Sequence, residues 1–230
     1  MSRFVRVIQI VQPIVLVALP VIMLLWAWLK LPNAALVTSA CACAALVPFF
    51  VGFEKSRRRA RDLMPVVVLT ALAVAGRLVF APVPAIKPIV ALVVMGGLCF
   101  GKDNGFMIGA LAMLVSNVFF GQGPWTPWQM FSMGLVGYLA GVMGRHGWLT
   151  RRWSIAAFGA SIALLYGFIL DTWTIVGFVS NANTASVLTT YAAGLVNNVA
   201  SAMGTVAFLV PIAHTWPRMF GRIKKRYQIG

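Results

Sequence analysis

The nine residues GQGPWTPWQ (Gly121–Gln129) separate two long apolar runs, and this alternation of apolar run and short loop decides the fold. We call these nine residues the tryptophan loop. Its two prolines fix φ and remove backbone donors, so the loop has a defined shape. Its two indoles, Trp125 and Trp128, present flat apolar surfaces with one hydrogen-bond donor at the edge. Such a loop suits either an anchor at the membrane interface or a platform for an organic ligand.

The composition predicts an all-α polytopic membrane protein embedded in a lipid bilayer. Of the 230 residues, 60% are hydrophobic and only 10% are charged, whereas a soluble domain carries about 25% charged residues. Long apolar runs recur along the chain, as bilayer-spanning helices require. The net charge is +15, but the basic residues alternate with the apolar runs instead of forming one patch, so we expect no nucleic-acid partner.

The apolar runs predict about eight membrane spans with both termini cytoplasmic. The spans cover residues 11–29, 34–53, 63–80, 86–101, 104–120, 128–144, 154–173 and 189–213. With a cytoplasmic N-terminus, the inner segments carry sixteen lysines and arginines and the outer segments carry only Lys30 and Lys87. Because cytoplasmic loops are enriched in basic residues, this bias fixes the orientation. Arg77 is left inside a span.

The charge-dense stretch EKSRRRARD (Glu54–Asp62) divides the chain. Residues 1–62 form a two-helix transmembrane hairpin and its basic cytoplasmic loop, in which we find no recognisable chemistry. Residues 63–215 form a six-span unit that holds the informative polar residues. Residues 216–230 form a basic cytoplasmic tail.

Three loops of the six-span unit face outward in this topology and can converge on one site. The turn Ala81–Lys87 supplies a positive charge at Lys87, and the tryptophan loop supplies its indoles and the amides of Gln122 and Gln129. The third loop, Phe178–Leu188, supplies asparagines. Aromatic surface and a few convergent polar groups are typical of small-molecule sites.

Arg77 is the most informative polar residue within a span. A charge in an apolar helix is costly, so it faces a cavity or a partner, unless it extends toward the headgroups at the nearby outer end. Asp171, near the outer end of its own span, is the natural partner of Arg77. The amides of Asn117 and Asn197 also lie within spans, where they serve either interhelical hydrogen bonds or a ligand. Asn117 precedes the tryptophan loop by one turn, so we prefer it as a ligand contact.

Other sequence patterns argue against ATP hydrolysis, metal binding and catalysis by this chain. Gly96–Asp103 has the glycine spacing of a nucleotide-binding loop, but it lacks the final Ser or Thr and follows an apolar span, so we expect no ATP hydrolysis here. The three cysteines lie in apolar runs and predict neither a disulfide nor a metal site. We find no catalytic motif. Ala71 and Ala75 are four residues apart, a spacing that lets helices approach closely within the chain or at another membrane subunit.

Several blocks resemble the substrate-binding subunits, or S components, of bacterial energy-coupling-factor (ECF) importers. These blocks are TALAVAGR (70–77), KPIVALVV (87–94), the span Gly105–Phe120, SNVFFGQGPWTPWQM (116–130) and GLVGYLAG (134–141). The last two blocks resemble a subfamily that includes the cobalamin-type S components. The resemblance covers about residues 63–215, which hold the six spans of the S-component fold, and the preceding hairpin is additional.

The resemblance implies a non-catalytic, multi-pass subunit of the bacterial plasma membrane that captures a vitamin at the outer face. Such subunits dock on a transmembrane coupling protein and two cytosolic ATPases, which use the ATP, so no cofactor is expected in this chain. Ala71 and Ala75 match the small-residue pattern of the helix that contacts the coupling protein. The resemblance favours cobalamin as the substrate, while the loops are also compatible with riboflavin, pyridoxine or a deazaguanine precursor.

Two other functions remain open at this point. One is a membrane enzyme that acts on a lipid-linked substrate, with Arg77 and Asp171 as its polar core. The other is a structural subunit in which the loop tryptophans are only interfacial anchors.

Overall fold

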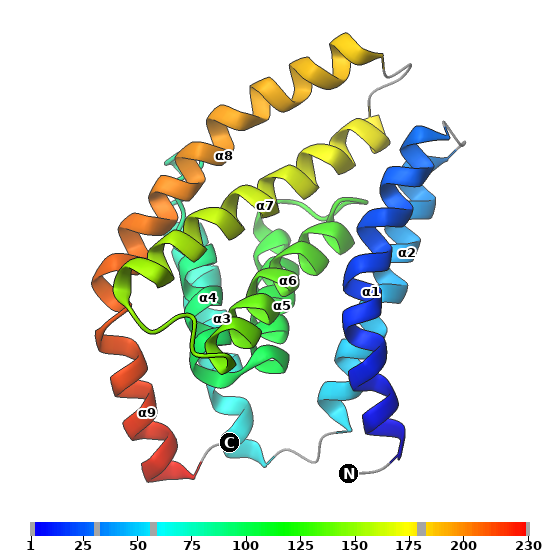
Figure 1. Cartoon of the computed structure of the whole chain (residues 1–230). Coiled ribbons are helices and arrows are strands. Elements are labelled where there is room, and N and C mark those ends of the chain that lie inside the picture. The colour runs from blue at the N-terminus through cyan, green and yellow to red at the C-terminus, as the bar shows by residue number, and fades with distance from the viewer. Residues whose placement is uncertain (1–2, 30–32, 56–58, 179–182, 229–230) are drawn as a thin grey trace.

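A computed structural model describes residues 3–29, 33–55, 59–178 and 183–228, and every regular element in these ranges is an α-helix (Figure 1). The prediction of an all-α protein is therefore confirmed. The helices are α1 (Arg3–Trp28), α2 (Ala34–Glu54), α3 (Ala60–Val79), α4 (Ile89–Phe100), α5 (Lys102–Phe120), α6 (Thr126–Arg145), α7 (Arg152–Phe178), α8 (Thr184–Ile212) and α9 (Thr215–Tyr227).

The helices α1 to α8 correspond to the eight predicted spans. Five of the described helices are long and apolar enough to cross a membrane, namely α2, α3, α5, α7 and α8. The shortest of the eight, α4, has 12 residues and a length of about 18 Å. Pro88 precedes it, and Gly101 ends it with φ 88°, a conformation that favours glycine.

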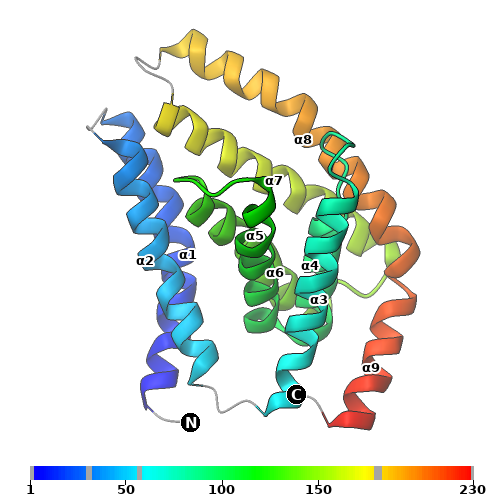
Figure 2. The same cartoon turned by 180° about the vertical axis from the view of Figure 1, so that it is seen from behind.

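The helices α1 and α2 run side by side as a hairpin at one flank of the molecule, and α3 to α8 form the larger unit (Figures 1 and 2). Within that unit α5 and α6 pack closely because glycines meet at their crossing. A Cβ atom at Gly105 or Gly109 would collide with the backbone of α6, at Gly137 and Met133 respectively. These small-residue pairs therefore serve internal packing, whereas Ala71 and Ala75 on α3 are exposed.

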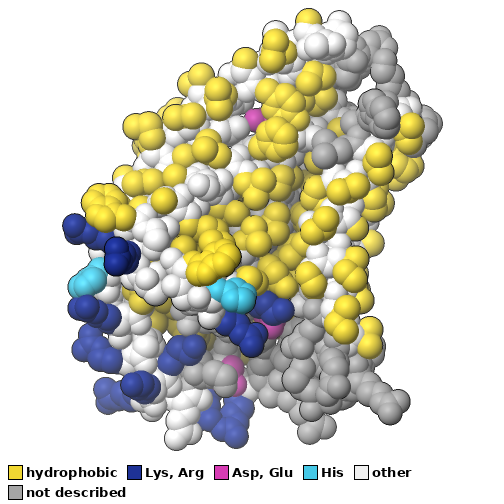
Figure 3. Space-filling view, in the orientation of Figure 1, with side chains coloured by type: hydrophobic (Ala, Val, Ile, Leu, Met, Phe, Trp, Pro, Cys, Tyr) yellow, Lys and Arg dark blue, Asp and Glu magenta, His cyan; other side chains and the backbone are white. Residues whose placement is uncertain are grey.

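The helix α1 begins and α9 ends at the same end of the molecule, where lysine and arginine side chains gather (Figures 1 and 3). We call this the inner end. The turn between α3 and α4 and the tryptophan loop lie at or toward the opposite, outer end (Figures 1 and 2). The arrangement agrees with the topology predicted from the basic residues.

Two segments differ from the sequence prediction. The basic tail contains a helix, α9, whose Phe220 ring packs edge-on against Phe100 at 5.0 Å between centroids. The third outer loop is also shorter than predicted. The helix α8 begins at Thr184, because Asn183 caps it by accepting a hydrogen bond of 2.8 Å from the Ser186 amide. Residues 179–182 of that loop lie outside the described residues.

Candidate substrate-binding site

The candidate site is a cavity of about 220 Å³ among α3 to α8. We call it the outer cavity. All six helices of the larger unit, together with the turn between α3 and α4, contribute to its walls. The lining residues are Arg77, Ala85, Lys87, Ile89, Val90, Met113, Met133, Tyr166, Leu170, Asn197 and Ser201.

Arg77 enters the cavity wall from the last turn of α3, and α5 holds its side chain in place. Its Nη1 donates hydrogen bonds to the hydroxyl of Ser116 and, at 2.8 Å, to Oδ1 of Asn117. No described residue accepts a hydrogen bond from its Nε or Nη2. A guanidinium carries five N–H donors in a fixed plane, so Arg77 is both anchored and able to donate to a ligand.

Asn117 connects the arginine to the tryptophan loop. Its Nδ2 donates to Oε1 of Gln129 at 2.6 Å and to the hydroxyl of Thr126 at 3.3 Å. The same hydroxyl donates to Oε1 of Gln122 at 2.9 Å. The structure thus brings together Arg77, Asn117, Gln122 and Gln129, all proposed from sequence as site residues, in one hydrogen-bond network. Asn117 orients Arg77 and does not line the cavity itself.

A second positive charge lies close to Arg77 at the mouth of the cavity. The Arg77 guanidinium is 4.6 Å and the Lys87 ammonium 5.7 Å from the ring centre of Phe120. The ring attracts both cations, so one aromatic side chain holds the two charges near each other. Burial, and then the neighbouring charge of Arg77, lower the pKa of Lys87 below its ordinary value.

The turn that carries Lys87 is strained at the cavity wall. The Ile86 amide donates to the Pro84 carbonyl at 2.7 Å, which closes a three-residue turn around Ala85. Ala85 has φ 60°, so this is the rarer form of the γ-turn, which a residue with a Cβ atom disfavours. Strained backbone of this kind is frequent where a chain must shape a ligand site.

The two loop tryptophans do not line the outer cavity. Trp128 lies in α6, is fully buried, and packs edge-on against Phe131 at 6.2 Å between centroids. Trp125 is half-buried and folds back over Gly123, where a side chain would collide with its indole. In this conformation the tryptophans therefore shape the loop and are not ligand contacts.

Asp171 does not pair with Arg77, because each side chain has other partners. Nδ2 of Asn198 on α8 donates to the Asp171 carboxylate on α7 at 2.7 Å. A glycine faces each of the two side chains: a Cβ atom at Gly194 would collide with Asp171, and one at Gly167 with Asn198. We call this reciprocal contact the α7–α8 clamp.

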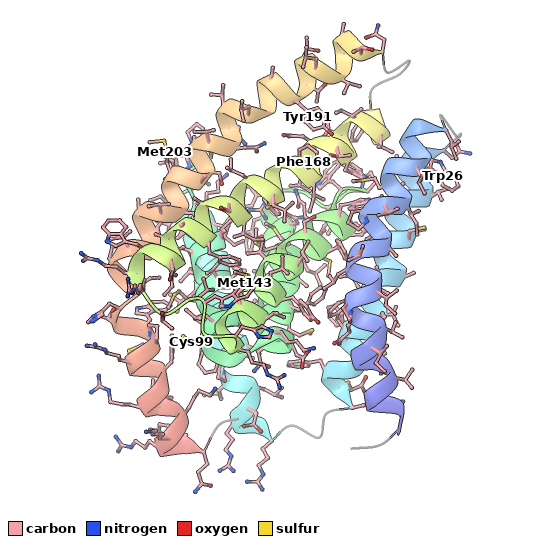
Figure 4. All side chains as sticks on the ribbon, viewed as in Figure 1. Trp26, Cys99, Met143, Phe168, Tyr191 and Met203 are labelled. Carbon is pink, nitrogen blue, oxygen red and sulfur yellow. The ribbon has the colours of Figure 1, made fainter. Side chains whose placement is uncertain are left out.

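A second contact reinforces the clamp one turn away. Tyr191 on α8 stacks on Phe168 of α7 at 5.1 Å between ring centres, and its hydroxyl lies 2.9 Å from that of Thr172 (Figure 4). Asn197, next to the clamp residue Asn198, lies in the wall of the outer cavity. The clamp therefore fixes the part of α8 that lines the site.

Tyr166 and Ser201 line the cavity but were not identified from the sequence. Tyr166 lies in the middle of an apolar span, where a tyrosine hydroxyl needs a polar partner or a cavity. This requirement is the feature of the sequence from which Tyr166 could have been identified as a site residue. Ser201 follows Asn197 by four residues on α8, so the two share a helix face.

The fold and the cavity define a small-molecule-binding protein that crosses the membrane several times. A family model described as "ECF-type riboflavin transporter, S component" matches residues 59–214. The chain belongs to this S-component family. The match begins within four residues of the predicted boundary and contains the whole outer cavity. A search of curated proteins and a search of solved structures each found no match.

Membership of this family excludes one alternative left open by the sequence and bears on the choice of substrate. S components are transporter subunits, so the chain is not a membrane enzyme acting on a lipid-linked substrate. The matched family is named for riboflavin, and nothing in the comparisons supports the cobalamin-type subfamily.

Proposed function

We propose that this chain is the substrate-binding subunit of an ECF-type importer and that riboflavin is the vitamin it captures. The outer cavity is the observation that carries the proposal, since all six helices of the region matched by the family line it. The name of the matched family supports the choice of vitamin.

The chemistry of the cavity walls suits a flavin. The isoalloxazine ring system is flat and largely apolar, with two carbonyl oxygens at one end, and the ribityl chain carries hydroxyls. Arg77 and Lys87 offer donors for carbonyl oxygens, and Met113, Met133 and Tyr166 offer polarisable surface for the rings. From α8, Asn197 and Ser201 supply polar groups for hydroxyls.

The size of the cavity favours a flavin over cobalamin. Its volume of about 220 Å³ lies below the range of about 300–1,000 Å³ that is usual for drug-sized ligands. Any vitamin therefore requires the outer ends of the helices to separate. Cobalamin, with a corrin ring and a nucleotide loop, is several times larger than riboflavin and requires a far greater separation.

The importer partners are a transmembrane coupling protein and two cytosolic ATPases. Ala71 and Ala75 support this part of the proposal, because both are exposed on α3. The neighbouring side chains of Val67, Val68 and Leu72 are exposed apolar groups on the same helix. A surface of small and apolar residues allows close contact with a helix of another membrane protein.

Riboflavin binding to the purified chain tests the proposal. We expect the chain, in detergent and without ATP, to quench riboflavin fluorescence saturably and to melt at a higher temperature with the vitamin. Arg77→Ala should abolish both effects. Arg222→Ala, which removes an exposed charge on α9, should leave them unchanged.

A panel with cobalamin, pyridoxine and a deazaguanine precursor distinguishes the substrates. If another vitamin binds in an Arg77-dependent way, riboflavin is the wrong substrate; if none binds the folded chain, the proposed function is wrong.

A further inference from the structure

A second hollow lies at the inner end of the molecule, away from the outer cavity. It consists of two adjoining parts between α9 and the inner ends of α4, α5, α6 and α7. The first part, of about 460 Å³, is lined by Leu98, Cys99, Leu149, Thr150, Ile155, Ala213, His214, Pro217, Arg218, Gly221 and Lys224. The second, of about 760 Å³, shares Leu98, Cys99 and Lys224 with the first. We call the two parts together the inner groove.

The second part of the inner groove is strongly cationic. Lys102, Arg145 and Lys224 line it together with His146, and Asp103 is the one acidic residue among its lining side chains. The first part adds the positive charge of Arg218. Positive charge concentrated in a concave surface attracts anions such as phosphate groups.

The first part of the groove has an apolar floor. Leu98, Leu149, Ile155 and Ala213 line it, and the last three are buried. Lys224 stands where this floor meets the cationic part. A ligand that fills both parts therefore has an apolar portion and an anionic portion.

The helix α9, which forms one wall, is fixed to the rest of the protein. The Lys224 ammonium donates to the carbonyl of Cys99 at 3.2 Å. Cys99, labelled in Figure 4, lies close to the C-terminus of α4. This is the end of a helix dipole that favours a positive charge. Phe220 packs between the rings of Phe100 and Trp216, at 5.0 and 5.4 Å between centroids. The groove is thus a built feature of the fold.

Exposed indoles place the groove at the level of lipid headgroups. Trp148, in the segment that joins α6 to α7, is 66% exposed, and Trp153, in the first turn of α7, is 62% exposed. The Arg152 guanidinium lies 5.2 Å from the ring centre of Trp153. Exposed tryptophan beside arginine is typical of the interface between the bilayer core and the headgroups.

We propose that the inner groove binds one anionic phospholipid of the inner leaflet. An acyl chain covers the apolar floor, and the headgroup phosphate lies among the lysine and arginine side chains. An acidic protein surface would satisfy the charges alone, whereas a phospholipid also supplies an apolar portion for the floor, so the lipid fits both parts. The bound lipid connects α9 to the inner ends of α4, α5 and α6.

A charge-matched pair of variants tests the proposal. Arg145→Gln/Arg218→Gln removes two positive charges that line the groove, and Arg222→Gln/Lys225→Gln removes two α9 charges that do not. In nanodiscs of phosphatidylcholine with phosphatidylglycerol, we expect native mass spectrometry to show one retained phosphatidylglycerol on the wild type and on the second variant. The first variant should lose this lipid. Circular dichroism and monodisperse elution establish that both variants fold, and the readout does not depend on any vitamin.

Several outcomes would overturn the proposal. Equal loss of phosphatidylglycerol in both variants would show only a general attraction between the basic protein and anionic lipids. No loss in either variant would place the bound lipid elsewhere. If inorganic phosphate stabilises the wild type as much as phosphatidylglycerol does, the groove is a site for a free anion and not for a lipid. Loss of ATPase binding in the first variant, without any lipid change, would show a protein interface. If the first variant does not fold, titration of the wild type with phosphatidylglycerol against phosphatidylcholine decides: saturable retention of one anionic lipid supports the site, and equal retention of both lipids contradicts it.

Discussion

Arg77 combines two roles that a lysine cannot combine. One nitrogen of its guanidinium is held by Ser116 and Asn117, and its other donors are left for a ligand. A lysine ammonium is a point charge on a flexible stem and does not have this fixed fork. The orientation of the donors therefore depends on the arginine itself and on the amide behind it.

We expect Arg77→Lys to weaken vitamin binding by about tenfold or more, because loss of a hydrogen bond between a charged donor and a buried acceptor costs about 1.5–3 kcal/mol. Fluorescence titration with riboflavin measures the change. Arg222→Lys, on the exposed side of α9, is the matched control and should bind as the wild type does. Equal affinity of the Arg77→Lys protein would show that the fork makes no contact with the ligand.

We expect vitamin binding to decline at alkaline pH, because Lys87 loses its positive charge there. The folded protein holds the Lys87 ammonium near Arg77 and partly away from water, so its pKa lies below the ordinary value of 10.5. Without ligand, the charged form is disfavoured in the folded state, and stability therefore rises as the pH increases through the lowered pKa. A ligand that accepts a hydrogen bond from the ammonium binds best below that pKa and loses affinity above it.

The pH profile of riboflavin binding tests this expectation. The decline should begin below pH 10.5 in the wild type and move to higher pH in Lys87→Arg, because arginine stays protonated. Lys87→Met should bind more weakly at neutral pH and lose this part of the profile. A profile that is the same in all three proteins would exclude Lys87 from the site.

At the scale of whole helices, the α7–α8 clamp sets the distance between α7 and α8. Asp171 and Asn198 fit between the two helices only because Gly194 and Gly167 face them. We expect Gly194→Ala to push α8 away from α7 and to lower the melting temperature, with weaker vitamin binding because Asn197 moves with the helix. Overpacking of this kind typically lowers the free energy of unfolding by about 1–3 kcal/mol.

The matched control is Gly221→Ala, also within a helix but with open space around its position. There alanine should be neutral or stabilise the helix by up to about 1 kcal/mol. Circular dichroism melting and fluorescence titration of the two variants give both readouts. If Gly194→Ala is as stable as Gly221→Ala and binds normally, the clamp does not position the site.

The sequence predicts most helices of this fold because a span must be long and apolar. The helix α9 was missed because it is too polar to be a membrane span, and its ring contact and hydrogen bond with α4 show why it folds back. For the site, the charges and amides of Arg77 and Asn117 were informative, since such groups need partners in a membrane. Their actual pairing was not predictable, because the chain does not show which helices are neighbours. Asp171 was expected beside Arg77 and lies instead against Asn198.

At the scale of the whole molecule, the N-terminal hairpin is joined to the six-helix unit at both ends of α2. Near the outer end, the Ser39 hydroxyl donates to the Pro124 carbonyl in the tryptophan loop at 2.7 Å. Near the inner end, Phe49 stacks on Phe106 of α5 at 3.7 Å between ring centres and meets Tyr138 of α6 edge-on. The hairpin, in which the sequence showed no chemistry, therefore braces both α5 and α6.

We expect Phe49→Ala to lower the melting temperature while vitamin affinity stays unchanged, because Phe49 is buried against α5 and α6 and does not line the outer cavity. Truncating a buried phenylalanine in a soluble core costs about 3–5 kcal/mol. Here the cost should be about 2 kcal/mol, because lipid tails replace water as the competing environment and only packing is lost. Thermal unfolding in detergent, with and without riboflavin, measures both quantities.

Two further variants separate bracing from a direct role of the hairpin in binding. Val47→Ala alters an exposed side chain of α2 and should change neither stability nor affinity. Ser39→Ala removes the hydrogen bond to the tryptophan loop, which leads through Gln129 and Asn117 to Arg77. If the loop needs that bond to hold Arg77 in place, Ser39→Ala should weaken riboflavin binding although Ser39 is remote from the cavity. A loss of affinity in Phe49→Ala as large as that in Ser39→Ala would instead mean that the hairpin positions the whole bundle around the ligand.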